Sequence, residues 1–92
     1  MFLHTAANGH LALEFDDSPE ELWEAALERL KAEAFRETGE SVLGPGQSIF
    51  PSYVRWSILL MSGWDEWSGN YLLATCEDGD AFLEKLHATL TG

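Results

Sequence analysis

Residues 18 to 39, SPEELWEAALERLKAEAFRETG, decide the fold, because the start, the body and the end of this stretch all predict one helix. Ser18 can cap the first turn, Pro19 suits the first helical position, and Glu21 completes a Ser-x-x-Glu capping box. Gly39 can end the helix in a left-handed conformation. We therefore predict a helix over 18–39 that packs on a sheet.

The predicted helix has two different faces. Its apolar residues recur at intervals of three and four, which places them in one stripe against a core: Leu22, Trp23, Ala26, Leu27, Leu30 and Ala34. The opposite face carries four acidic residues close to the positive end of the helix dipole: Glu20, Glu21, Glu24 and Glu28. The same helix is thus expected to supply both core packing and the densest exposed acidity.

Residues 2–15 predict a β-hairpin, because Asn8-Gly9 is the dipeptide that best adopts a two-residue type I′ turn. Pairing Ala7 with His10 then places six side chains on the core face: Phe2, His4, Ala6, Leu11, Leu13 and Phe15. In this register His4 and His10 fall on opposite faces and cannot share a metal. We interpret His4 as a packing residue beside Leu13 and His10 as a residue that faces solvent, and we expect no metal site.

The second half of the chain is less regular. Residues 40–52, ESVLGPGQSIFPS, contain two Pro and two Gly and predict a loop. Residues 53–62, YVRWSILLMS, are predicted as a strand, and a helix that ends at Gly63 is the alternative. In the strand, four residues face the core: Val54, Trp56, Ile58 and Leu60. Residues 71–77 predict a further strand with Cys76 buried as a small apolar residue, and residues 80–90 predict a short helix capped by Asp80.

These elements predict an α+β fold over residues 1–92: a small single-domain antiparallel sheet in the order β-β-α-β-β-α, with the main helix packed on one face. A chain of 92 residues can bury one modest core, and a hydrophobic fraction of 46% argues against disorder. The single cysteine excludes an intrachain disulfide. Neither a signal peptide nor a membrane-spanning run is recognisable, so a cytoplasmic location is expected.

Charge is the strongest compositional feature, because 16 Asp and Glu against 5 Lys and Arg give a formal net charge of −11. This excess disfavours direct binding to nucleic acid or to an anionic membrane and favours a protein partner with a basic surface. The alternative is that the acidity serves only solubility.

Residues 63–70, GWDEWSGN, are predicted as a loop that combines two indoles with two carboxylates: Trp64, Asp65, Glu66 and Trp67. Trp is enriched at the energetic centres of interfaces, and acids beside it suit a basic pocket. The alternative is that one or both indoles fold back to cover the end of the sheet. Together with the acidic face of the 18–39 helix, these four residues are the candidate partner-binding site.

No catalytic, cofactor or nucleotide motif is present, so we expect neither an enzyme nor a cofactor. We expect an acidic binding protein that inhibits its partner by occupying a nucleic-acid-binding surface as a DNA mimic, the partner being a nucleic-acid-binding complex or a nuclease. In size, charge and Trp content the chain is similar to small phage-borne anti-defence proteins and to immunity proteins that neutralise basic nuclease toxins. The alternative is an oligomerisation module, such as a homodimer, that uses one apolar sheet face: Tyr53, Leu59, Met61, Tyr71 and Leu73.

Overall fold

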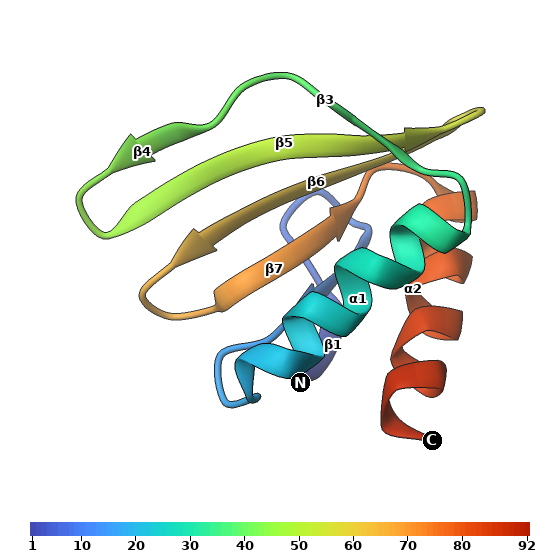
Figure 1. Cartoon of the computed structure of the whole chain (residues 1–92), viewed down its shortest axis with the longest axis horizontal. Coiled ribbons are helices and arrows are strands. Elements are labelled where there is room, and N and C mark those ends of the chain that lie inside the picture. The colour runs from blue at the N-terminus through green and yellow to red at the C-terminus, as the bar shows by residue number, and fades with distance from the viewer.

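The computed structural model describes residues 1–92 as one seven-stranded antiparallel sheet with two helices (Figure 1). The strands are β1 (Phe2–Thr5), β2 (Leu11–Glu14), β3 (Arg36–Thr38), β4 (Val42–Gly44), β5 (Gln47–Arg55), β6 (Ile58–Asp65) and β7 (Gly69–Ala74), and the helices are α1 (Glu20–Ala32) and α2 (Glu77–Thr91). The α+β class is confirmed. The predicted order of elements is wrong, because five strands and not two separate the helices.

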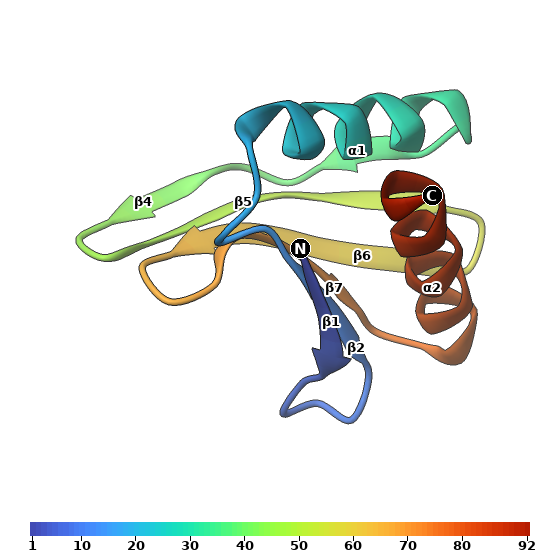
Figure 2. The same cartoon turned by 90° about the horizontal axis from the view of Figure 1, so that it is seen from below.

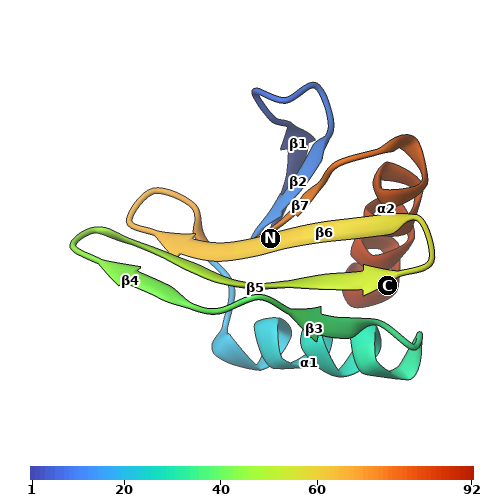
Figure 3. The same ribbon diagram turned by 90° about the horizontal axis from the view of Figure 1, so that it is seen from above.

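The strands lie in the order β1-β2-β7-β6-β5-β3, and β4 pairs with the other half of β5. The amino-terminal hairpin therefore joins the sheet beside β7, the last strand of the chain. Figures 2 and 3 show this hairpin turned across the direction of β5 and β6, so the sheet is strongly twisted. Both helices cover the same face of the sheet, and the other face is left open.

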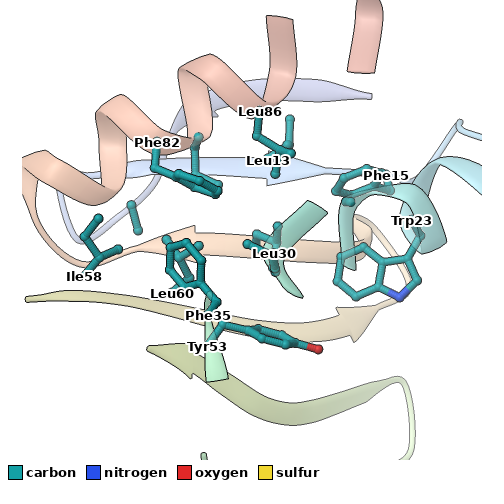
Figure 4. Packing of buried hydrophobic residues seen from close by; sticks show 14 residues of the cluster. Leu13, Phe15, Trp23, Leu30, Phe35, Tyr53, Ile58, Leu60, Phe82 and Leu86 are labelled. Atoms are coloured by element: carbon teal, nitrogen blue, oxygen red, sulfur yellow. The ribbon is translucent and has the colours of Figure 1, made fainter. Parts of the chain in front are cut away.

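The core lies between the helices and one face of the sheet (Figure 4). Its sheet residues are cross-strand partners, since Leu13 pairs with Leu72 and Leu60 pairs with Ala74. The helices contribute Trp23, Ala26, Leu30, Phe82, Leu83 and Leu86. The predicted stripe of the first helix is thus confirmed for Trp23, Ala26 and Leu30. Leu22 and Leu27 are partly buried against the core, and Ala34 is exposed.

The start of α1 differs from the prediction. Pro19 takes the cap position with φ −61° and ψ 149°, so Ser18 lies one residue too early to cap the helix and the capping box does not form. The Ser18 N–H instead donates to the carbonyl of Phe15 at 3.1 Å, and the Ser18 hydroxyl is buried without a partner. Phe15 sets this turn, because its ring packs edge-on against Trp23 at 5.2 Å between ring centres.

The end of α1 comes seven residues before Gly39. Ala34 has φ +69°, the Phe35 N–H donates to the Leu30 carbonyl at 2.9 Å, and the Ala34 N–H donates to the Lys31 carbonyl at 3.0 Å. This pair of hydrogen bonds is a Schellman motif, which pairs the last carbonyls of a helix and turns the chain away. The turn carries Phe35 into the core beside Phe82, and the chain continues as β3.

The register of the first hairpin is one residue from the prediction, because Thr5 pairs with Leu11. The turn has three residues, and of these only Gly9 has a positive φ (+84°), which is the pattern of the three-residue hairpin loop. Leu3 therefore packs against the core, and His4 lies on the open face, where it contacts Glu14 at 2.5 Å. Phe2, predicted in the core, is 60% exposed.

The prediction that His10 faces solvent is wrong. Its Nδ1 lies 2.9 Å from a carboxylate oxygen of Asp80, whose other oxygen accepts a hydrogen bond from the Leu11 N–H at 2.8 Å. Asp80 is thus a link between the hairpin and α2 and not the predicted helix cap. The cap is Cys76, which is partly exposed and accepts a hydrogen bond from the Gly79 N–H at 3.4 Å.

The predicted loop 40–52 is wrong, because this region forms β4 and most of β5. Residues 53–62 are extended and not helical, as predicted, but they belong to two strands, β5 and β6. Ile58 and Leu60 are buried as predicted, whereas Val54 lies on the open face. Trp56 and Ser57 form a two-residue turn, in which Trp56 has φ +52° and is 90% exposed instead of facing the core. Pro51 lies where the β5 register shifts, which is the usual place for Pro in a strand. The shift turns Tyr53 to the helix side, where burial and the nearby charge of Glu37 raise its pKa to about 12.

Ala34 gives a stability test, because a left-handed backbone is unfavourable for any residue with a Cβ. We expect Ala34→Gly to raise the free energy of unfolding by about 0.5–1 kcal/mol, measured by urea denaturation. Ala32→Gly is the matched control and should lower it, because Ala32 has helical geometry. Equal effects of the two changes would contradict the Schellman ending of α1.

Asp80 gives a pH test. Burial opposes ionisation of its carboxyl, but the hydrogen bonds from His10 and the Leu11 N–H, and the His10 charge, together hold its pKa below the ordinary value of 3.8. Its stabilising effect is therefore present above pH 3.8 and is lost as the pH falls through the folded-state pKa. We expect Asp80→Asn to be less stable than wild type at neutral pH, and the difference to shrink in strong acid.

The matched control is Asp78→Asn, which removes the same charge from an exposed position in the same helical turn. Urea denaturation at neutral and acid pH measures both variants. A wild-type advantage over Asp80→Asn that persists unchanged in strong acid would contradict the role given to the carboxylate.

Candidate functional site

A hollow of about 330 Å³ lies between the start of α1 and the turn that joins β6 to β7. Nine residues line it: Phe15, Asp16, Ser18, Glu20, Trp64, Asp65, Glu66, Gly69 and Asn70. Four of these nine are acidic, and none is a Lys or Arg. The structure therefore brings Glu20 together with Trp64, Asp65 and Glu66, which are more than forty residues away in the chain.

Gly69 allows the two sides of the hollow to meet. It has φ +65°, and a Cβ at this position would lie 2.7 Å from the Cα of Asp16, far inside van der Waals contact. Beside this contact the Phe15 N–H donates to the Asn70 carbonyl at 2.9 Å. The start of α1 is therefore held against the β6–β7 turn by backbone contacts, independently of the acidic side chains.

The β6–β7 turn is short and well ordered by hydrogen bonds. The predicted loop 63–70 is wrong in extent, since only residues 66–68 lie outside the two strands. One oxygen of Asp65 accepts hydrogen bonds from the N–H groups of Trp67 at 2.9 Å and Ser68 at 2.6 Å, and the Glu66 N–H donates to the Gly46 carbonyl at 3.3 Å. Asp65 is therefore both a wall of the hollow and the residue that shapes the turn.

The two indoles of this region have different positions. Trp64 is 38% exposed and lines the hollow, so it partly covers the end of the sheet. Trp67 is 79% exposed at the tip of the turn and does not line the hollow. Trp64 thus partly follows the folded-back alternative, whereas Trp67 projects beside the acidic residues.

The other predicted site residues on α1 lie elsewhere. Glu24 and Glu28 line a separate groove of about 300 Å³ between α1 and the strands β3 and β5, together with Lys31, Glu37 and Tyr53. Glu21 is exposed and lines neither cavity. The predicted acidic face of the helix is therefore divided, and only its first residue belongs to the hollow.

Asp16 belongs to the hollow but was not among the predicted residues. Its position directly before the 18–39 stretch was visible in the sequence, but the contact with Gly69 was not, because it joins residues 53 positions apart. Its neighbour Asp17 is exposed and pairs with the amino terminus at 2.8 Å, and this hydrogen bond and charge lower the pKa of Asp17. The charge of Asp17 is thus largely compensated within the chain.

The chemistry of the hollow is that of a hydrogen-bond acceptor. Its carboxylates can accept from cationic donors, and the indole of Trp64 offers a flat face beside them. Tyr71 does not line the hollow but lies on the open face of the sheet, where burial and the nearby charge of Asp65 raise the pKa of its phenol. No group of three or more His, Cys, Asp or Glu residues is arranged to hold a metal ion.

No protein-family model, curated protein or solved structure matches this chain. Neither α1 nor α2 has the length and apolar character that a membrane crossing requires.

The contact of Gly69 with Asp16 can be tested by adding a methyl group. We expect Gly69→Ala to lower the free energy of unfolding by roughly 2–4 kcal/mol, because it combines a left-handed backbone with a clash against the Asp16 backbone. Gly9→Ala is the matched control, since Gly9 also has a positive φ but has no atom within 4 Å of an added Cβ. Gly9→Ala should lower the free energy of unfolding by only about 1–2 kcal/mol. Equal losses in urea denaturation would contradict the close contact.

Proposed function

We propose that this chain is a non-enzymatic acidic binding protein whose partner presents a basic surface to the hollow between α1 and the β6–β7 turn. The observation that supports this most is the composition of the hollow, where four carboxylates and an indole meet without any Lys or Arg. Like charges held together without counter-charges repel one another, and a cation from outside relieves that repulsion. The hollow is therefore suited to a partner's Arg or Lys.

Arg is the better fit of the two cations. Its planar guanidinium can donate two parallel N–H hydrogen bonds to the oxygens of a carboxylate and can stack on an indole face at the same time. The hollow offers Glu20, Asp16 and Glu66 as exposed carboxylates beside the partly exposed Trp64. A volume of about 330 Å³ is ample for such a side chain.

Trp67 supplies the apolar part of the interface. An exposed indole whose backbone is already fixed loses little conformational freedom on binding, so more of its contact energy is available for affinity. The two hydrogen bonds from the turn to Asp65 fix that backbone. The charged hollow and the projecting indole then act side by side.

A protein that normally binds nucleic acid is the partner class with this pattern, because rows of Arg and Lys are what hold phosphates. The chain would replace phosphates by carboxylates and so act as a DNA mimic that inhibits its partner. The proposed role is that of an anti-defence protein of a phage or an immunity protein against a nuclease toxin, to which the chain is similar in size, charge and Trp content.

Binding to a fluorescein-labelled arginine-rich peptide, followed by fluorescence anisotropy, tests the site. We expect the affinity to fall steeply between low and moderate salt. A triple variant of the hollow, Asp16→Asn, Glu20→Gln and Glu66→Gln, should bind about tenfold more weakly, because three screened ion pairs are lost. In a competition assay, wild type should displace duplex DNA from the same peptide, and this variant should displace it less well.

The matched control removes three exposed acids outside the hollow: Glu40→Gln, Glu77→Gln and Glu84→Gln. It has the same net charge as the site variant, so it should lose less affinity if the hollow is the binding site. Equal losses would show that the charge acts diffusely over the surface and would contradict the proposal. Binding that is insensitive to salt would contradict it as well.

A further inference from the structure

We propose that the open face of the sheet, opposite the helices, is a self-complementary surface on which a second copy of this chain docks. This inference concerns the open face, which adjoins the acidic hollow at Asp65, and depends on the arrangement of the strands. The partner is a homodimer mate, and the contact is isologous, with the same residues used by both copies.

The open face carries apolar residues in continuous cross-strand rows. One row crosses six strands, since each residue pairs with the next: Val42, Ile49, Gly63, Tyr71, Glu14 and Phe2. A second row joins Met61, Leu73, Ala12 and His4. Several members are well exposed for apolar residues, at 61% for Val42, 60% for Phe2 and 40% for Met61.

Four of the five residues predicted from the sequence to form an apolar face share this open face: Leu59, Met61, Tyr71 and Leu73. Tyr53 is the exception, because the shift in β5 turns it into the core. The structure adds the residues of β1 and β4, which lay outside the predicted face. The face is therefore wider than the two strands on which it was predicted.

The open face carries few charges of either sign, which argues for a second copy as its occupant. Only three of the 16 acidic residues lie in strands, namely Glu14, Glu37 and Asp65, and Glu37 bonds the helix-side Tyr53. The two that remain are already engaged, Glu14 by His4 and Asp65 by the N–H groups of its turn. Arg36 pairs with Val54 and so adds a positive charge to this face, which leaves it close to neutral. Two copies of a chain with charge −11 therefore repel one another less through this face than through the acidic helices.

The shape of the face also suits a paired contact. Gly63 leaves space for the ring of Tyr71, whose hydroxyl would lie 2.6 Å from a Cβ added at Gly63, so the ring lies down across β6. A hollow of about 220 Å³ opens beside it, between β1 and the β6–β7 turn. An exposed, flexible side chain such as Met61 of one copy can fill the hollow of the other.

The size is adequate as well. A stable interface needs about 800 Å² from each partner, so in a molecule measuring 32 × 29 × 26 Å the contact must use most of the open face. Because the helices cover the opposite side of the sheet, docking through the open face directs α1 of both copies outward. The dimer then presents two acidic hollows, and a partner with repeated basic sites would bind it with avidity.

Light scattering coupled to size-exclusion chromatography, over a range up to high micromolar concentration, tests the proposal. We expect wild type to approach twice the monomer mass as concentration rises. Met61→Lys and Phe2→Lys each place a charge on the open face and should stay monomeric. Both side chains are exposed, so folding is preserved, and circular dichroism verifies this.

The matched control is Leu43→Lys, because Leu43 is 76% exposed but pairs with Ser48, on the opposite face of the sheet. It should dimerise like wild type. A monomeric wild type at the highest concentration, a dimer that survives both open-face changes, or higher assemblies that grow from the sheet edges would each overturn the proposal. The affinity of one acidic hollow for the arginine-rich peptide should be the same in Met61→Lys as in wild type. The dimer proposal can therefore fail while the proposed binding site still holds, and the reverse.

Discussion

The candidate site depends on one steric constraint, the contact between the Gly69 backbone and the Asp16 backbone. A Cβ at residue 69 would lie 2.7 Å from the Asp16 Cα, so only Gly allows this approach. The contact is made by the same two segments that pair β2 with β7, and it fixes where α1 begins relative to the β6–β7 turn. Acidic residues that repel one another are therefore held together by the sheet and not by their own interactions.

Sheet pairing also explains why the two surfaces of the molecule differ. Successive residues of a strand face opposite sides, so one set packs under the helices and the other is left uncovered. Thirteen of the 16 acids lie outside the strands, in helices and connections. The open face is thus poorer in acids than the helices and connections.

The sequence alone was enough for the α+β class, the existence of both helices and the central stripe of α1, because these depend on local periodicity. It was insufficient where tertiary contacts compete with local signals. Burial of Phe35 ends α1 at an Ala although Gly39 was available, and a turn at Trp56 and Ser57 carries no Gly or Pro to mark it. For the site, the sequence predicts the two Trp and two acidic residues of the β6–β7 turn. It does not predict that they lie beside Glu20, because that proximity depends on the contact of Gly69 with Asp16.

The basic residues are distributed unevenly over the molecule. All five bases lie away from the hollow: Arg29 and Lys31 in the last turn of α1, Arg36 in β3, Arg55 at the end of β5, and Lys85 in α2. Figure 2 shows α1 running from the side of the β6–β7 turn toward the opposite end of the sheet. At that end Arg55 is held by the Glu33 carbonyl at 2.9 Å and lies over the Phe35 ring at 4.8 Å. The hollow is therefore acidic without any base, whereas the rest of the molecule carries charges of both signs, and such an uneven field orients an encounter before any contact forms.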